Sequence, residues 1–113
     1  MSWKENALIN RAYLSLGSNL GNKAENINSA IELLSERAGK VLKVSSNYET
    51  EPDGFVSENS FVNIALSLDT PLDALALLEV CEQIEKELGR KTKSINLNYS
   101  DRVIDIDILY FNN

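Results

Sequence analysis

Histidine is absent from this chain of 113 residues, and cysteine occurs once, at Cys81. Without an imidazole there is no histidine acid–base catalysis, no histidine metal ligand and no Ser-His or Cys-His triad. A single cysteine cannot form an intramolecular disulfide. No apolar run approaches the ~18 residues of a membrane span, and residues 1–10 lack the continuous apolar stretch of a secretory signal. These absences predict a cytoplasmic protein whose chemistry rests on carboxylates, arginines and backbone groups.

Basic residues are also scarce, because 11 Lys and Arg stand against 17 Asp and Glu, a net charge of −6. This balance argues against a nucleic-acid partner held by bulk charge. The charges are unevenly placed: residues 44–85 contain nine acids and no Lys or Arg, whereas residues 86–102 carry five basic and two acidic side chains. The basic stretch is therefore either an anion-binding loop or a solvated surface.

The length and composition predict one globular domain. A chain of this mass buries about two-thirds of its surface on folding, which is enough for one core. Its 43% hydrophobic and 25% charged residues are typical of a soluble domain. We expect residues 1–10 to form an extension and residues 11–113 to form the domain.

Hydrophobic periodicity predicts the elements of that domain. Alternating side chains predict strands at residues 11–17, 61–69 and 102–111, and a β-rich composition predicts another at residues 41–48. Apolar residues at helical spacing predict two helices, the first between a cap at Asn22 and a stop at Gly39. The second is expected to start with Thr70 as its cap and to stop at Gly89. The order β-α-β-β-α-β predicts a ferredoxin-like α+β fold, an antiparallel sheet with two helices on one face.

The opposite face of this sheet is expected to be open and to carry the polar members of each alternation. These are Tyr13, Ser15, Phe61, Asn63, Asp105 and Asp107. Asp105 and Asp107 lie two residues apart on one strand, so their Cα atoms are about 6.6 Å apart on the same side. Magnesium favours one or two carboxylates together with substrate phosphates, which makes the pair a candidate magnesium site. The alternative is a solvated strand face or an edge protected by charge.

The neighbouring basic residues are candidate phosphate ligands. Arg90 and Arg102 are the stronger candidates, because a guanidinium meets phosphate oxygens in a two-pronged way that Lys91 and Lys93 cannot. They could equally be solvated surface charges.

Other polar segments are less specific. Residues 17–22 match neither a Walker loop nor the GxGxxG pattern, and they predict a tight turn. Phe61 and Asn63 offer a ring and an amide to a flat heterocycle, or form an ordinary exposed strand face. Cys81 lies on the apolar stripe of the second helix, where a small buried hydrophobe is expected.

Taken together, five segments resemble the hydroxymethyldihydropterin pyrophosphokinases of folate biosynthesis. They are Tyr13–Asn19, Val44–Pro52, Phe61–Asn63, Glu85 with Gly89-Arg90, and Asp101–Leu109. The resemblance runs from about Arg11 to the end, and its most specific part is the Arg-x-x-Asp-x-Asp pattern. It implies transfer of a pyrophosphoryl group from MgATP to the hydroxymethyl group of 6-hydroxymethyl-7,8-dihydropterin, with release of AMP.

The resemblance also implies roles for individual residues. Asp105 and Asp107 would hold two magnesium ions on the triphosphate, while Arg90 and Arg102 would neutralise charge on the transferred group. Further nucleotide contacts are implied for Glu85, Lys91, Lys93 and Ile108. The implied pterin site consists of Thr50, Pro52, Asp53, Phe61 and Asn63, with Phe61 stacking on the ring.

Members of that family continue for several tens of residues past the last strand, whereas this sequence ends at Asn113. We therefore expect Val103, Leu109 and Phe111 to be uncovered on the open face and to favour a homodimer or a higher oligomer. Two alternatives to the enzyme remain: a catalytically silent module that binds pterin or nucleotide, and a ferredoxin-like interaction domain.

Overall fold

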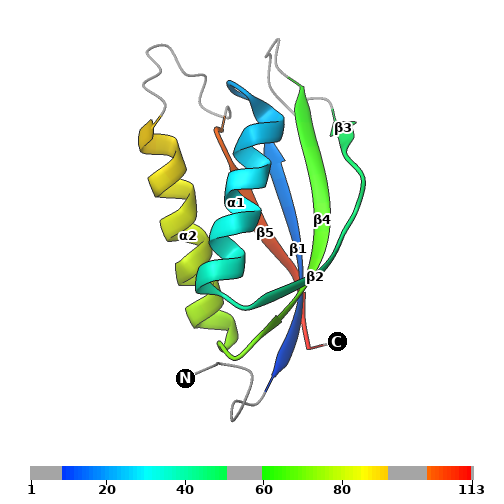
Figure 1. Cartoon of the computed structure of the whole chain (residues 1–113), viewed down its shortest axis with the longest axis vertical. Helices are drawn as coiled ribbons and strands as arrows, with labels where there is room; N and C mark the ends of the chain where they lie inside the picture. Colours follow the sequence, from blue (N-terminus) through cyan, green and yellow to red (C-terminus); the bar gives the residue numbers. More distant parts are fainter. Residues whose placement is uncertain (1–8, 51–59, 92–101, 113) are drawn as a thin grey trace.

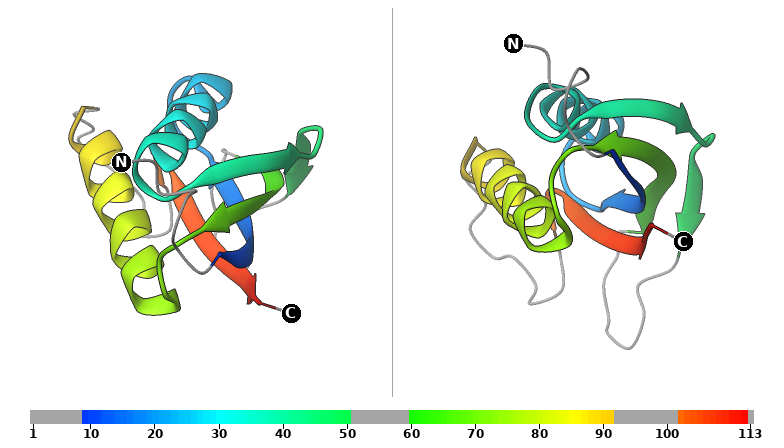
Figure 2. Two further views of the ribbon diagram at one scale, coloured as in Figure 1. Left: turned by 60° about the horizontal axis from the view of Figure 1, so that its bottom comes forward. Right: turned by 90° about the horizontal axis from the view of Figure 1, so that it is seen from below.

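The computed structural model describes residues 9–50, 60–91 and 102–112, without the side chains of residues 50, 90 and 91. In these residues the elements follow in the order β1 (Asn10–Ser18), α1 (Lys23–Arg37), β2 (Lys40–Val44), β3 (Tyr48–Thr50), β4 (Phe61–Thr70), α2 (Ala74–Lys91) and β5 (Asp105–Phe111). The antiparallel sheet has the strand order β2-β4-β1-β5, and β3 pairs with β4. Both helices cover the same face of this sheet (Figures 1 and 2). The predicted ferredoxin-like α+β fold is confirmed.

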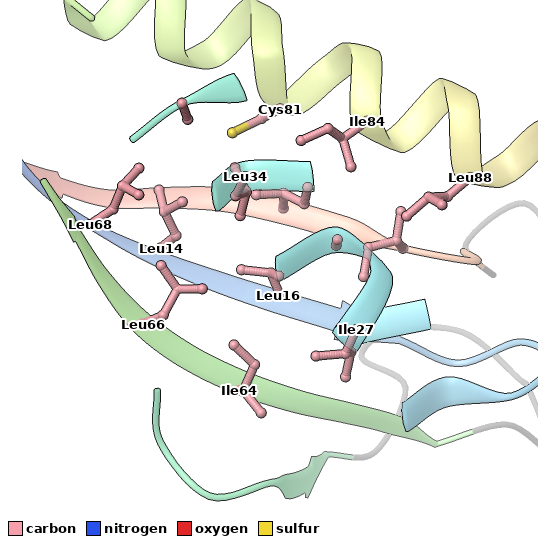
Figure 3. Packing of buried hydrophobic residues seen from close by; sticks show 14 of the residues in the cluster. Leu14, Leu16, Ile27, Leu34, Ile64, Leu66, Leu68, Cys81, Ile84 and Leu88 are labelled. Atoms are coloured by element: carbon pink, nitrogen blue, oxygen red, sulfur yellow. The ribbon is translucent and has the colours of Figure 1, made fainter. Parts of the chain in front are cut away.

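The core lies between the central strand β1 and the two helices. Leu14 and Leu16 of β1 are fully buried, and they meet Leu34 of α1 and Ile84 of α2 within one apolar cluster (Figure 3). Cys81 belongs to this cluster, as predicted, and burial raises the pKa of its thiol to about 12. A thiol that stays protonated at neutral pH is a poor nucleophile, so Cys81 acts as a small packing residue.

The predicted strand over residues 41–48 is two strands, β2 and β3, and the reason is local. After Val44, the ladder partner of Ala65 is Ser45, whose backbone N–H donates to the Ala65 carbonyl at 2.8 Å. The Ser45 hydroxyl oxygen accepts from the Ala65 N–H at 2.9 Å, in place of a backbone carbonyl. Because a side chain has taken a ladder position, regular pairing stops here and resumes at Tyr48.

The boundaries of α1 are confirmed, whereas α2 starts later than predicted. The side chain of Asn22 accepts from the Glu25 N–H at 3.1 Å and caps α1. Thr70 does not cap α2, because it is still paired in β4 and its hydroxyl donates to the Ala38 carbonyl at 2.5 Å. Asp73 caps α2 instead, by accepting from the Ala76 N–H at 2.8 Å.

The expectations that Gly89 stops α2 and that the last strand starts at residue 102 are also wrong. Gly89 lies inside α2, which continues to Lys91. The last strand, β5, starts at Asp105, because the backbone of Arg102 is bonded to Asn19 and not to a neighbouring strand.

An irregularity in β5 corrects the expected apolar patch. Leu14 pairs with Ile108 but Tyr13 pairs with Tyr110, so Leu109 is an extra residue in the ladder. This bulge reverses the alternation, placing Tyr110 on the open face and returning Phe111 to the core side, where it packs against the cluster. Val103 is also buried, at 8% exposure. Of the three residues expected on the open face, only Leu109 is exposed there.

No helix in the described ranges is long and apolar enough to cross a membrane.

Gly39, in the connection between α1 and β2, lies directly against the backbone of β4. A Cβ added at this residue would lie 2.0 Å from the carbonyl oxygen of Asp69 and 2.9 Å from the Cα of Thr70. Both neighbours are backbone atoms of β4, which cannot move without disturbing its pairing with β1 and β2. Only glycine allows the chain to pass here from α1 into β2.

Replacing Gly39 with alanine should therefore destabilise the fold. We expect Gly39→Ala to lower the free energy of unfolding by at least about 2 kcal/mol, the scale of a severe packing clash, as measured by urea denaturation. Gly89→Ala is the matched control, because no atom lies within 4 Å of an added Cβ there. Equal stability of the two variants would contradict the close approach at Gly39.

Candidate active site

Phe61, Asn63, Asp105 and Asp107 lie at one end of the sheet, where β1 ends and β4 and β5 begin (top of Figure 1). Across this end, Tyr48 of β3 pairs with Asn63 of β4, Asn63 with Gly17 of β1, and Gly17 with Asp105 of β5. Directly paired residues point to the same side of a sheet, so this row faces away from the helices. Gly17 thus separates Asn63 from Asp105 by two strand spacings, roughly 10 Å between their Cα atoms.

The carboxylates of β5 lie close enough to repel one another. Burial raises the pKa of Asp107, and the charge of Asp105 raises it further. The pKa of Glu85, on α2, is also raised, by burial first and then by both aspartates. A site that concentrates negative charge in this way favours a bound cation.

Glu85 also braces the strand that carries this pair. Its carboxylate accepts from the backbone N–H of Ile106 at 2.8 Å, and Ile106 stands between the two aspartates. This bond satisfies an amide on β5 and fixes the strand against α2. Glu85 therefore lies beside the carboxylates and not apart from them.

Arg102 is exposed, and Asn19 holds its backbone. The Asn19 side-chain oxygen accepts from the Arg102 N–H at 2.7 Å, and the Asn19 N–H donates to the Arg102 carbonyl at 3.1 Å. Asn19 is fully buried in the turn after β1, which Asn26 of α1 braces by donating to the Leu20 carbonyl at 2.9 Å. The turn thereby fixes the backbone three residues before Asp105.

The predicted heterocycle ligands lie on the other side of Gly17. Phe61 and Asn63 are half-buried on β4, and Thr50 of β3 is the backbone partner of Phe61. The Asn63 amide nitrogen lies 3.5 Å from the carbonyl oxygens of Tyr48 and Phe61, at the outer limit of hydrogen bonding. The ring and the amide are therefore brought together on the open face.

Several predicted site residues fall outside this geometry. Pro52, Asp53 and Lys93 lie outside the described residues, as do the side chains of Thr50, Arg90 and Lys91. The backbone of Arg90 and Lys91 forms the last turn of α2, which ends at the same end of the sheet (Figure 1). Ile108 is half-buried and packs against the core, on the face opposite Asp107.

Gly17 and Asn19 are structural parts of this site that local sequence reasoning assigned only to a strand end and a tight turn. Their partners are 46 and 83 residues away, as Asn63 and Arg102. The only local signal was an uncharged Gly-Ser-Asn segment at the end of a strand. The segment itself does not indicate which distant residues it contacts.

The donor set suits a cation that is shared with a substrate. Within residues 9–50, 60–91 and 102–112, no group of three or more His, Cys, Asp or Glu side chains is arranged to hold a metal ion by itself. Asp105 and Asp107 supply two carboxylates, which is the protein contribution that magnesium needs when phosphates complete its coordination. The repulsion between these carboxylates supports the same conclusion.

Comparison with known proteins gives a consistent assignment. Residues 13–112 match the family model of 7,8-dihydro-6-hydroxymethylpterin-pyrophosphokinase (HPPK). The chain is 47% identical over 97 residues to the 2-amino-4-hydroxy-6-hydroxymethyldihydropteridine pyrophosphokinase of Porphyromonas gingivalis, covering 86% of this chain and 66% of the relative. It is 42% identical over 104 residues to the enzyme of the same name from Bacillus subtilis, covering 91% and 60%.

Solved structures agree on the fold. A crystal structure of Plasmodium falciparum HPPK-DHPS, a triple mutant with SDX-DHP, superposes with a TM-score of 0.75 at 22% identity, covering 96% of this chain and 30% of that one. The wild-type protein gives a TM-score of 0.73 at 21% identity, covering 96% and 28%.

The chain spans between 60% and 66% of the length of the curated relatives from P. gingivalis and B. subtilis. The family model nevertheless matches nearly all of it, from β1 through β5. The chain therefore belongs to the 7,8-dihydro-6-hydroxymethylpterin-pyrophosphokinase family.

Proposed function

We propose that this chain carries the site for transfer of pyrophosphate from MgATP to 6-hydroxymethyl-7,8-dihydropterin. The relatives named for this activity support the proposal, as does the resemblance of the sequence motifs. The main observation behind the proposal is the row of paired residues across the sheet, from Tyr48 through Asn63 and Gly17 to Asp105. Asn63 and Asp105 lie on either side of Gly17, so a flat heterocycle at Asn63 would reach a metal–phosphate group at Asp105 with a short substituent.

The reaction breaks one phosphoanhydride bond and forms one phosphoester bond. The hydroxymethyl oxygen attacks the β-phosphorus, the bond from that phosphorus to the oxygen bridging the α- and β-phosphates breaks, and AMP departs with that oxygen. The hydroxyl proton passes to solvent. Catalysis of this kind rests on positioning and charge stabilisation, which suits a chain without histidine.

The residues of the site divide between the two substrates. Phe61 would stack on the pterin face, while Asn63 and Thr50 would bond its edge, with Pro52 and Asp53 completing that pocket. Arg90 and Arg102 would contact the triphosphate, helped by Lys91 and Lys93. Glu85 would face the nucleotide while holding β5, and Ile108 would lie near the base.

Asp105 and Asp107 would hold magnesium, and we propose two ions. When bound with ATP, magnesium neutralises the triphosphate and lowers the cost of charge that develops during transfer. We also propose a cytoplasmic location, where both substrates and magnesium are available.

Removing either metal ligand should abolish turnover. We expect Asp105→Asn and Asp107→Asn each to lower kcat/KM by at least about a hundredfold, the scale seen when one charge-stabilising group is lost. Magnesium-dependent AMP production from ATP and the pterin alcohol measures this. Asp69→Asn is the control, because Asp69 lies at the other end of β4 in an ion pair with Arg11.

Unchanged activity in both Asp105→Asn and Asp107→Asn would contradict the metal assignment. Ligand binding by the wild-type chain without AMP release would favour the silent binding module, and absence of any binding would favour the interaction domain. Calorimetry with ATP and with the pterin separates these outcomes.

The raised pKa of Asp107, caused by burial and then by the charge of Asp105, predicts an unusual stability effect. The pKa of Asp107 is raised in the folded state. The stability that this carboxyl group contributes is therefore fully present below its ordinary pKa of 3.8, and it is lost as the pH rises through the raised pKa. At pH 7 the ionised carboxylate thus opposes folding. We expect Asp107→Asn to raise the Tm of the metal-free protein at pH 7 by about 1–3 °C, with no gain near pH 3.

Thermal unfolding at both pH values measures this gain, and addition of magnesium should stabilise the wild type more than Asp107→Asn. A lower Tm for the variant at pH 7 would show that Asp107 stabilises the fold.

We propose, as a separate point, that the open face mediates self-association. Tyr13, Leu109 and Tyr110 line an apolar groove of about 470 Å³, and Leu109 and Tyr110 are 51% and 62% exposed. Static light scattering at tens of micromolar should give at least twice the 12.6 kDa mass of one chain. Leu109→Lys should restore the monomer, and a monomeric wild type would contradict the proposal.

A further inference from the structure

Gly17 occupies a position where the sheet itself has no need of glycine. Positive φ values occur at Gly21 and Gly39 among the described glycines, and not at Gly17. Gly17 lies in the central strand and pairs on both sides, with Asn63 and with Asp105. Glycine inside a strand weakens it, because it packs no side chain and loses more entropy on folding. The sheet alone would therefore favour another residue.

The space that a side chain would fill at Gly17 is already occupied. A Cβ there would lie 2.6 Å from Oδ1 of Asn63 and 3.3 Å from Cδ1 of Phe61, and the third-nearest atom, at 3.6 Å, is Cγ of Asn63. The amide and the ring thus rest directly on the β1 backbone. The three nearest atoms belong to the proposed heterocycle ligands and none of them to the carboxylates of β5.

The kind of atom that an added Cβ meets distinguishes this glycine from Gly39. At Gly39 the obstacle is the backbone of β4, which cannot yield without loss of pairing. At Gly17 the obstacles are the far end of the Asn63 side chain, which must shift, and the edge of the Phe61 ring, which must give by a few tenths of an ångström. A methyl group at Gly17 would therefore displace the Asn63 amide and the Phe61 ring while leaving the sheet intact.

We propose that Gly17 is a positioning residue for the heterocycle. Because Gly17 has no side chain, the Asn63 amide and the Phe61 ring can lie directly against the β1 backbone. This inference rests on the proposed function, because it assigns Asn63 and Phe61 to the pterin. A methyl group at residue 17 displaces the Asn63 amide and the Phe61 ring into the space that the flat heterocycle would occupy. The MgATP side of the site keeps its geometry.

The test is Gly17→Ala, studied by steady-state kinetics and by calorimetry. The KM and the Kd of the pterin should rise by at least about tenfold, the effect of losing one to two hydrogen bonds. The KM of MgATP should stay within twofold of wild type, and the Tm should be retained. A purely structural role would instead lower the Tm and change both KM values together.

Two further variants sharpen the result. Gly89→Ala is the matched control for a glycine with open space, and it should leave the affinity for the pterin unchanged. If Gly17→Ala weakens pterin binding by displacing the Asn63 amide, the double variant Gly17→Ala with Asn63→Ala should bind pterin no more weakly than the single variant with the lower affinity. Additive losses would overturn the assignment of the effect to Asn63.

A readout without substrate keeps this inference distinct from the proposed function. In ligand-free protein, NMR of Gly17→Ala should show shifts in the Asn63 side-chain amide and the Phe61 ring, with the Leu14 and Leu34 methyl groups unchanged. Wild-type affinity for pterin in Gly17→Ala would overturn the role of Gly17 alone. Failure of the wild-type chain to bind pterin would overturn the proposed function, and the pterin role of Gly17 with it.

Discussion

The pairing of β1 with β4 on one side and with β5 on the other is the constraint on which the site depends. β1 is central in the sheet and its buried side chains Leu14 and Leu16 fix which face meets the helices. A shift of one residue in either register would turn these side chains to the open face, which the core does not permit. The same register sets Asn63 and Asp105 on either side of Gly17. The hydrophobic core therefore determines the distance between Asn63 and Asp105 in the candidate site.

The site holds its charged residues with bonds that start in neighbouring elements. Glu85 of α2 accepts from the amide of Ile106, and Asn19 of the turn after β1 is bonded twice to the backbone of Arg102. These contacts keep β5 in place although Asp105 and Asp107 repel each other. Burial, and then the charge of Asp105, raises the pKa of Asp107. Under the proposed function, a bound cation would relieve this unfavourable charge.

Sequence patterns predicted the elements correctly where a single local interaction determines the structure. Burial of alternate residues determines the strands β1 and β4, and the Asn22 cap determines the start of α1. Prediction failed where a side chain competes with the backbone ladder, as at Ser45, or where an extra residue reverses the alternation, as at Leu109. It also failed at Thr70, because a hydroxyl that could cap a helix instead bonds to Ala38. Such choices depend on partners far away in the sequence.

The sequence alone determined the chemistry that this protein has available, because residue types and their spacing along one strand are local properties. It placed Asp105 and Asp107 on one side of a strand and Phe61 beside Asn63 on another. Only the tertiary structure decided that these two pairs lie about two strand spacings apart, with Gly17 between them. It also decided that Asn19 holds Arg102. The physical reason is that strand order and register follow from burial of the whole core, which no single segment specifies.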